Sequence, residues 1–274
     1  MPELPEVEVL RRSLAPRLQG DVFNLIEVYN PALREQVDGK NLGRSLEGRR
    51  VLTVGRRAKY LLVSVEGGQT LVVHLGMSGR LTLADAGAAR ELHEHAAFYL
   101  TSGRKLRFRD PRRFGLLLAL PTSGLPLDRH FSRLGEEPVD ESFSATTLTV
   151  AARGRRVAVK SFLMDPTVVV GVGNIYACET LFRAGVHPLR SVARISERRW
   201  ERIAVSLVEV LQAAITEGGT TLNDFVDASG DPGYFQVSLS VYGREGEPCH
   251  QCDTAVRKKR QQGRSTYYCA RCQT

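Results

Sequence analysis

Two cysteine pairs near the end of the chain place the strongest constraint on its fold. Cys249-His250-Gln251-Cys252 and Cys269-Ala270-Arg271-Cys272 are separated by sixteen residues. Each Cys-x-x-Cys pair can wrap one side of a tetrahedral ion, and four thiolates complete the coordination of a structural zinc. The spacing therefore predicts one Zn²⁺ bound by Cys249, Cys252, Cys269 and Cys272, in a hairpin too small to have a core of its own.

Two further residues that could bind a metal have plainer interpretations. His250 is a possible competing ligand, but the spacing favours the four thiols. Cys178, the fifth cysteine, falls within a predicted helix and is expected to be a core residue. An odd number of cysteines fits reduced thiols and a metal site better than a disulfide framework. Because a four-thiolate site is closed, we assign it no catalytic or redox role.

Basic residues form three groups in a chain whose formal net charge is +8. A net positive charge favours an anionic partner such as nucleic acid. One basic group can be a solvated face, but three favour a phosphate-binding surface. The groups are Arg104, Lys105, Arg107, Arg109, Arg112 and Arg113; Arg153, Arg155, Arg156 and Lys160; and Arg257, Lys258, Lys259, Arg260 and Arg264.

The first half of the chain changes from a helical to a strand pattern. Residues 4–18 predict a helix, with a proline in the first turn and apolar residues at helical spacing. Short strands separated by glycine turns follow from about 21 to 121, and favour an antiparallel sandwich or barrel. The expected strands include Val51–Val54, Tyr60–Val65, Thr70–His74, Ala96–Thr101, Lys105–Arg109 and Leu116–Leu120.

The second half is helical. Residues 122–145 are rich in proline, glycine and acidic residues, and resemble a linker. One helix is expected to begin near Gly173-Asn174 and end at Gly185, and a longer one to run from Ser196 to Gly218-Gly219. Such a helix pair is found in nucleic-acid-binding proteins, although this signal alone is weak. Residues 217–236 suggest a long functional loop.

These patterns predict an α+β multidomain protein. We expect an N-terminal helix with an antiparallel β-sandwich at 1–130, a linker at 131–145, a helical domain at 146–236 and a zinc finger at 237–274. No segment has the apolar length of a membrane span or the pattern of a signal peptide. The expectation is a monomeric cytoplasmic protein with no membrane partner.

The opening Met1-Pro2-Glu3-Leu4-Pro5-Glu6 allows two interpretations. Prolines and acidic residues suit the first turn of a helix, which is a purely structural role. Alternatively, removal of Met1 gives Pro2 a free secondary amine. An α-amino group has a pKa of roughly 8, so part of it is unprotonated near neutral pH. Such an amine can attack a sugar C1′ and form an iminium, which leads to strand cleavage.

Six motifs, in order along essentially the whole chain, resemble those of bacterial formamidopyrimidine-DNA glycosylases. They are Met1–Glu6, Arg57–Tyr60, His74–Gly79, Asp110–Gly115, Val170–Tyr176 and the four-cysteine finger. The resemblance implies a β-sandwich, a helix–two-turn–helix domain and a zinc finger, which match the segments above. It also implies a bifunctional glycosylase and AP lyase of base excision repair. Such an enzyme excises oxidised purines (8-oxoguanine, formamidopyrimidines) from duplex DNA and cleaves abasic sites by β,δ-elimination.

The resemblance assigns four catalytic residues. Pro2 is the nucleophile that forms a Schiff base with C1′, and Glu3 is the neighbouring acid or base. Lys59 lies in the active site and aids β-elimination, although a solvated strand lysine is the plain alternative. Arg264 of the finger binds phosphate and assists δ-elimination. Glu6 is expected to support the helix start.

The same resemblance assigns DNA contacts. Met77, Arg112 and Phe114 fill the gap left by a flipped base, since an apolar or aromatic side chain can wedge between base pairs. Asn174 is expected to be a phosphate ligand at a helix N-terminus, a cap of that helix, or both. His74, His93, Arg156 and Tyr242 are weaker assignments as DNA contacts. Residues 217–236 correspond to the lesion-sensing loop.

Two other functions stay open. Endonuclease VIII, a related glycosylase, shares the proline chemistry and the finger but prefers oxidised pyrimidines; Leu4 and the set of Met77, Arg112 and Phe114 favour the purine-specific branch. A non-catalytic zinc-finger DNA-binding protein is the second alternative. The loss of Pro2, Glu3 or Lys59 would support it, and all three are present.

Overall fold

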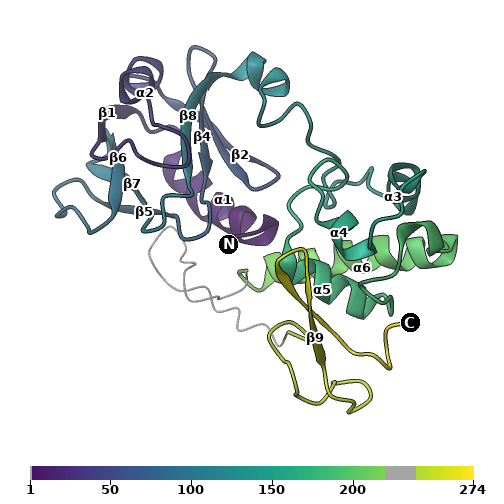
Figure 1. The fold of residues 1–274 in the computed structure, drawn as a ribbon. Coiled ribbons are helices and arrows are strands. Elements are labelled where there is room, and N and C mark those ends of the chain that lie inside the picture. The colour runs from purple at the N-terminus through teal and green to yellow at the C-terminus, as the bar shows by residue number, and fades with distance from the viewer. Residues whose placement is uncertain (1, 220–238) are drawn as a thin grey trace. The chain divides into compact units, whose positions relative to one another are not determined.

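The computed structural model describes residues 2–219 and 239–274. The chain divides into two compact units, with the boundary between Ser132 and Arg133. The C-terminal residues from 239 onward belong to the second unit (Figure 1). Within the described ranges, no helix combines the length and the apolar character that a membrane crossing requires.

The first unit is the predicted antiparallel sandwich. Its two four-stranded sheets have the strand orders β1-β6-β7-β5 and β2-β3-β4-β8, and every pairing is antiparallel (Figure 1). The strands are β1 (Phe23–Val28), β2 (Val51–Arg57), β3 (Tyr60–Val65), β4 (Gln69–His74), β5 (Arg80–Asp85), β6 (Glu94–Leu100), β7 (Arg104–Arg109) and β8 (Leu116–Pro121).

Helix α1 (Leu4–Leu18) covers one sheet of this sandwich. It packs against β2 and β3. The four apolar residues that predicted the helix, Val7, Leu10, Leu14 and Leu18, are all buried in the core. Their spacing places them on one face, so burial of that face positions the helix and its first residues.

Some elements of the first unit were not expected from the sequence. Helix α2 (Gly39–Leu46) is short and contains two glycines, and strand β1 does not alternate regularly between buried and exposed residues. Strand β5 was not predicted either. Part of the expected linker forms a 3₁₀ helix, η1 (Thr122–Leu127), which follows β8.

The second unit contains the predicted helix pair and a hairpin. Its elements are α3 (Ala145–Ala152), α4 (Val159–Leu163), α5 (Asn174–Arg183), the 3₁₀ turn η2 (Val192–Arg194), α6 (Glu197–Thr216), β9 (Arg257–Gln261) and β10 (Arg264–Tyr268). Gly185 follows α5 with a φ of 66°, the left-handed conformation that glycine supplies at helix ends. Trp200, Ile203, Leu207 and Leu211 form the buried face of α6, as predicted.

Strands β9 and β10 form a small hairpin with little apolar core. Gln262 and Gly263 connect them, and both have positive φ, as a tight two-residue turn requires. The apolar residues packed at its base include Cys178 of α5, which is fully buried. Cys178 is therefore a core residue, as expected.

Candidate functional site

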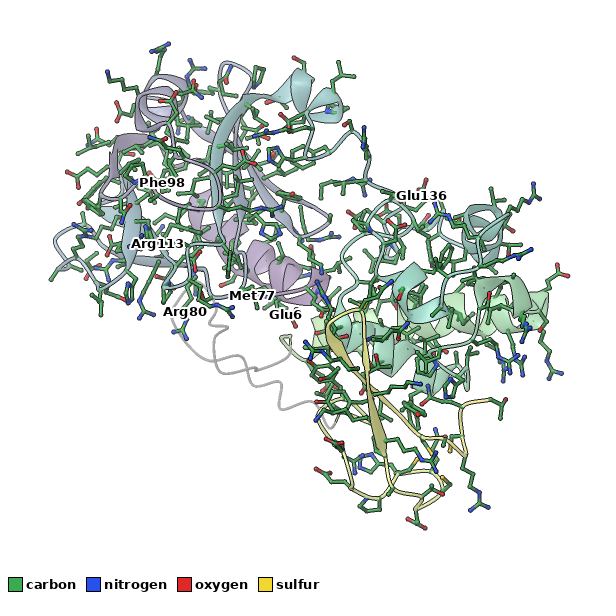
Figure 2. The ribbon with its side chains drawn as sticks, in the orientation of Figure 1. Glu6, Met77, Arg80, Phe98, Arg113 and Glu136 are labelled. Atoms are coloured by element: carbon green, nitrogen blue, oxygen red, sulfur yellow. The ribbon has the colours of Figure 1, made fainter. Side chains whose placement is uncertain are left out.

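The N-terminal candidates lie at the start of α1 in the first unit. Pro2 and Glu3 are both buried. The backbone N–H of Glu3 donates to Oε2 of Glu6 at 2.7 Å, and the two residues form a capping box. Glu6, labelled in Figure 2, thus supports the helix start as expected. The cap fixes the backbone beside Pro2 instead of leaving a frayed chain end.

Lys59 lies in the two-residue turn between β2 and β3. Ala58 precedes it with a φ of 54°, and Arg57 pairs with Tyr60 across the turn. The Arg56 guanidinium donates to the carbonyl of Ala58 at 2.9 Å and lies 3.3 Å from Glu8 of α1. One side chain therefore connects the Lys59 turn to the helix that carries the N-terminal candidates.

Glu8 is the anchor of this connection. Burial favours a higher pKa for this carboxyl group, but hydrogen bonds from Arg11 and Arg12 outweigh burial and hold its pKa below the usual value. Glu8 therefore carries a full negative charge at neutral pH. A buried carboxylate between several guanidinium groups holds the turn by charge as well as by hydrogen bonds.

His74 ends β4 directly opposite Tyr60 of β3. Its side chain is buried, and Nδ1 accepts a hydrogen bond of 2.9 Å from the backbone of Gly76. Burial, followed by the positive charge of Lys59, lowers the pKa of His74 to about 3. The ring is thus neutral and orients the loop after β4. Its predicted contact with DNA stays a prediction.

The three predicted gap-filling residues lie on two loops of the first unit. Met77 is half-buried in the loop between β4 and β5 (Figure 2). Arg112 and Phe114 lie on the loop between β7 and β8, where 46% of Phe114 is exposed. The Arg112 guanidinium carbon lies 5.2 Å from the centre of the Phe114 ring. An exposed aromatic ring and a neighbouring cation are groups that can contact bases.

A buried carboxylate holds these two loops together. Asp110 is fully buried and accepts hydrogen bonds from the Ser78 hydroxyl at 2.6 Å and the Gly115 backbone at 2.7 Å. A Cβ on Gly76, whose φ is 63°, would lie 2.4 Å from the carbonyl carbon of Phe114. Asp110 and Gly76 belong to two of the sequence motifs, but no role was predicted for either residue.

The structure corrects the prediction that the first basic group is an exposed phosphate-binding surface. Lys105 and Arg107 are buried in β7, a strand with a neighbour on each side. The Lys105 ammonium donates to the carbonyl of Ala88, and Arg107 pairs with Glu91. These two residues stabilise the strand and cannot form part of a phosphate-binding surface. His93, by contrast, is exposed just before β6.

Asn174, Tyr242 and the hairpin meet in the second unit. Asn174 is the first residue of α5, and the cap is Gly173, so the capping alternative is wrong. The Asn174 amide donates to the Ser265 carbonyl at 2.9 Å and to the Tyr242 hydroxyl at 3.5 Å. Its Oδ1 is buried with no hydrogen-bond partner among the described residues.

The two predicted arginines of the second unit are both exposed. Arg264 is the first residue of β10, directly after the tight turn, and therefore lies at the tip of the hairpin. Arg156 lies between α3 and α4. Exposed guanidinium groups can reach phosphate, and the structure leaves both assignments open as predictions.

The four predicted zinc ligands form one cluster. All four Sγ atoms lie within 4.8 Å of one another, with 3.9 Å between Cys249 and Cys272 and 3.4 Å between Cys252 and Cys269. A tetrahedron with Zn–S bonds of about 2.3 Å has S···S edges of about 3.8 Å, so the thiols fit one zinc ion. His250 is exposed, as expected for a residue that is not a ligand.

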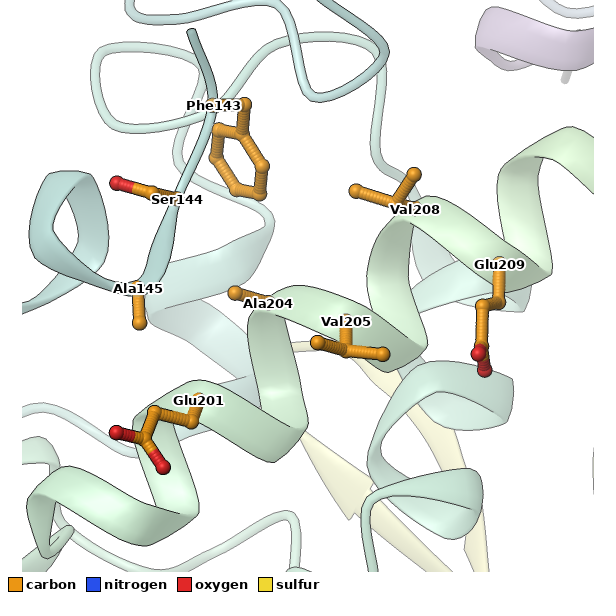
Figure 3. Close-up of a pocket in the computed structure, with 8 residues that line it drawn as sticks. All are labelled: Phe143, Ser144, Ala145, Glu201, Ala204, Val205, Val208 and Glu209. Carbon is orange, nitrogen blue, oxygen red and sulfur yellow. The ribbon is translucent and has the colours of Figure 1, made fainter. Parts of the chain in front are cut away.

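One pocket lies apart from all these candidates. It has a volume of about 400 Å³ and is lined mainly by apolar side chains of α6 and of the residues at the start of α3 (Figure 3). Two carboxylates, Glu201 and Glu209, lie at its edge. No predicted site residue lines it, and negative charge does not suit a DNA contact.

A capped helix start beside the buried Pro2, an exposed aromatic ring next to an arginine on the sandwich, and a four-thiol hairpin with a basic tip are features that suit a zinc-finger protein acting on DNA. Family models agree along the chain. Residues 1–117 match the formamidopyrimidine-DNA glycosylase N-terminal domain, residues 134–226 its H2TH domain, and residues 246–274 the zinc finger found in FPG and IleRS. The chain belongs to the formamidopyrimidine-DNA glycosylase family, whose members are base-excision-repair glycosylases and AP lyases with one structural zinc ion.

Full-length relatives support this membership. The formamidopyrimidine-DNA glycosylase of Pseudomonas putida GB-1 is 48% identical over 274 residues, with 100% of both chains covered. The crystal structure of the MutM (Fpg) protein from Thermus thermophilus is 38% identical with a TM-score of 0.88, covering 99% of this chain and 98% of that one. A Lactococcus lactis Fpg mutant in complex with Fapy-dG-containing DNA is 32% identical, with a TM-score of 0.92 and 100% of both chains covered.

Proposed function

We propose that this chain removes oxidised purines, 8-oxoguanine and formamidopyrimidines, from duplex DNA and then cleaves the strand through a covalent intermediate on Pro2. The observation that carries the proposal is the start of α1. There Pro2 is buried beside the capping box of Glu3 and Glu6, and Arg56 connects this helix to the Lys59 turn. Structures of the Lactococcus lactis relative have been solved in complex with DNA: one contains Fapy-dG and another contains an abasic site.

The chemistry requires that Met1 be removed, so that Pro2 has a secondary amine. The amine nitrogen attacks C1′, and the N-glycosidic bond breaks as the base leaves with a proton. Opening of the sugar ring then gives a protonated Schiff base. Glu3 protonates the ring oxygen O4′ in this step. A positioned carboxyl group contributes about 10²–10⁴-fold to such a proton transfer.

Strand cleavage follows from the iminium. Loss of a C2′ proton expels the 3′ phosphate by β-elimination, and a second elimination expels the 5′ phosphate. Lys59 assists the first step beside the reacting sugar. Arg264 binds the second leaving phosphate, and it acts by charge because a guanidinium stays protonated at ordinary pH.

DNA recognition uses residues from both units. Met77 and Phe114 wedge into the gap left by the flipped base, and Arg112 bonds the orphaned base on the opposite strand. His74, His93, Arg156, Asn174 and Tyr242 contact the DNA backbone. The expected lesion-sensing loop at 217–236 lies almost entirely outside the described residues. We further propose that the protein acts as a monomer on DNA in the cytoplasm.

Borohydride trapping tests the chemistry. The purified protein is mixed with an 8-oxoguanine:cytosine duplex and borohydride, and a covalent protein–DNA adduct is expected. The Pro2→Gly variant should trap much less adduct, whereas Pro5→Gly, the same substitution in the first turn of α1, should keep most of it. Mass spectrometry of the N-terminus checks that Met1 is absent.

The same assay separates the two alternatives. A thymine-glycol duplex that traps far better than the 8-oxoguanine duplex would favour the endonuclease VIII activity. DNA binding without any adduct would overturn the enzymatic proposal in favour of a zinc-finger DNA-binding protein.

A further inference from the structure

Arg56, the residue before the last in β2, contacts both the helix of the proposed nucleophile and the turn of Lys59. Its side chain is only 7% exposed, and that of its partner Glu8 is 11% exposed. The Nε atom donates to Oε2 of Glu8 at 3.3 Å, and Nη1 donates to the carbonyl of Ala58 at 2.9 Å. One planar guanidinium thus holds two elements with two different nitrogens, which the single ammonium nitrogen of a lysine cannot reproduce.

The contact at Ala58 acts on the backbone that leads into Lys59. Ala58 and Lys59 form the two-residue turn between Arg57 and Tyr60. Ala58 is buried and has a φ of 54°, a left-handed conformation that is unfavourable for every residue except glycine. The carbonyl that Arg56 holds belongs to the peptide bond between Ala58 and Lys59. A hydrogen bond to this oxygen therefore helps to fix the turn and the place where the Lys59 side chain begins.

Glu8 gives Arg56 a fixed point on α1. Its carboxylate also accepts hydrogen bonds from Arg11 at 2.8 Å and from Arg12 at 2.9 Å. Glu8 lies about one helical turn after Leu4, the first residue of α1. Because a helix is stiff over one turn, the position of Glu8 is set relative to the capped helix start beside Pro2. Arg56 thereby relates the Lys59 turn to the proposed nucleophile.

The charge of Lys59 acts close to the loop that carries Met77. Burial first, and then this charge, lower the pKa of the His74 ring. His74 pairs with Tyr60 and ends β4 directly before that loop. Coulomb energies fall with distance, so the ammonium must lie near this edge of the sheet. A shift of the turn would change the position of a charge beside the loops proposed to hold the DNA.

We infer that Arg56 is a positioning residue for the strand-cleavage step: it holds the Ala58-Lys59 turn to α1, so that the Lys59 ammonium and the Pro2 nitrogen keep one relative placement. The inference rests on the proposed function, in which Lys59 assists β-elimination from the iminium on Pro2. In this role Arg56 acts through Lys59 and does not itself contact the sugar. A misplacement of about 1 Å can slow a reaction about 10²-fold, so a contact that fixes only the turn can control the rate.

Abasic-site DNA separates the formation of the Schiff base from the elimination. Borohydride trapping measures the covalent adduct on Pro2, and strand cleavage under single-turnover conditions measures β-elimination. Arg56→Gln should form the adduct at close to the wild-type rate but cleave the strand about 10- to 100-fold more slowly. Arg56→Lys keeps a positive charge beside Glu8, but one nitrogen cannot make both contacts, so its elimination should also be slow.

Arg12→Gln is the matched control. Arg12 donates to the same carboxylate of Glu8, but it belongs to α1 and its side chain is 58% exposed. This variant removes a cation from Glu8 and leaves the bond to the Ala58 carbonyl in place. Its adduct formation and its elimination should both match wild type. Urea unfolding measures the stability of each variant, so that the rates are compared under conditions in which every protein is folded.

A double variant shows whether Arg56 acts through Lys59. Lys59→Ala should slow the elimination, and the combination of Arg56→Gln with Lys59→Ala should be no slower than Lys59→Ala alone. Two residues that act independently would give effects on the rate that multiply. Hydrogen exchange of residues 57–60 reports on the turn without any activity. It should be faster than wild type in Arg56→Gln and unchanged in Arg12→Gln.

Three results would overturn the inference. They are wild-type elimination by Arg56→Gln, equal slowing by Arg12→Gln, and rate effects that multiply in the double variant. Unchanged hydrogen exchange of the turn in Arg56→Gln would overturn its structural basis. A wild-type protein that neither forms the adduct nor cleaves the strand would instead overturn the proposed function, and the role of Arg56 in strand cleavage with it.

Discussion

The two units hold their functional loops in different ways. In the first unit, the loops that carry Met77 and Phe114 rest on a sandwich with a large apolar core, and the buried Asp110 carboxylate joins them. In the second unit, the hairpin that carries Arg264 has few apolar residues at its base. It depends on four thiols and on the buried Lys160, whose ammonium donates to Thr266 at 2.8 Å. A core tolerates single changes by small shifts, whereas a metal-bound hairpin depends on each ligand.

Removing the zinc should expose this difference most strongly. Cys269→Ser removes one ligand, and binding of structural zinc contributes about 10 kcal/mol or more to folding. The hairpin should unfold and DNA affinity should fall by more than tenfold, while the first unit keeps its melting transition. Circular dichroism, zinc content and anisotropy measure these effects.

Cys178→Ala is the control for that experiment. Cys178 is buried in the same cluster but is no ligand, so this variant should keep its zinc and its DNA affinity. Simultaneous melting of both units in Cys269→Ser would show that the first unit also depends on the metal.

A glycine tests the loop junction of the first unit. Gly76→Ala forces a left-handed backbone on alanine, which costs about 1–2 kcal/mol, and places a methyl group against Phe114, which costs about 1–3 kcal/mol more. Gly103→Ala has a similar φ of 80° but meets no atom within 4 Å. Urea unfolding should show about 3 kcal/mol lost in the first variant and about 1 kcal/mol in the second. Equal losses would mean that the two loops do not depend on their close contact.

Lys160 tests the polar tether of the second unit. Lys160→Met keeps the apolar stem but leaves the buried Thr266 hydroxyl and the partly buried Ser265 carbonyl with one donor fewer each. A lost hydrogen bond from a charged donor costs about 1.5–3 kcal/mol. Hydrogen exchange should speed up in β9 and β10 but not in the sandwich. Lys258→Met removes an exposed lysine of the same hairpin and should leave the exchange unchanged.

The smallest effect concerns pH and His74. The pKa of this buried ring is lowered to about 3 in the folded protein, so it stays neutral there while the unfolded chain takes up a proton below about 6.5. The contribution of the neutral His74 ring to the free energy of unfolding is therefore fully present above pH 6.5. This contribution is lost as the pH falls toward 3. From pH 7 to 5 the loss should be about 2 kcal/mol. Comparison of unfolding curves with those of His74→Asn should show a smaller loss in the variant.

The local patterns of the chain were enough to predict several elements. The helical spacing of Val7 to Leu18 and of Trp200 to Leu211 predicted α1 and the buried face of α6, because one face of an amphipathic helix must be buried. The cysteine spacing predicted the metal cluster for a similar reason, since each pair is close in sequence. Strand β1 does not alternate regularly, and helix α2 has only eight residues, two of them glycines, so neither was found this way.

Burial within a sheet was not predictable from composition. Lys105 and Arg107 were grouped with exposed basic residues, yet both are buried in β7 because that strand has a neighbour on each side and its charges meet partners from the segment before β6. The partners of Lys105 and Arg107 are distant in sequence or belong to the backbone. No local pattern of charges indicates them.

By itself the sequence determined the four cysteines of the metal cluster and the helices whose period buries one face, and it predicted Pro2 and Lys59 as the reactive groups. Only the tertiary structure decided how these groups are held. The capping box at Glu3, the Arg56 connection to the Lys59 turn and the Asp110 junction are contacts between side chains and specific backbone atoms. Their geometry depends on the packing of strands that are far apart in the chain, and that packing is a property of the whole core.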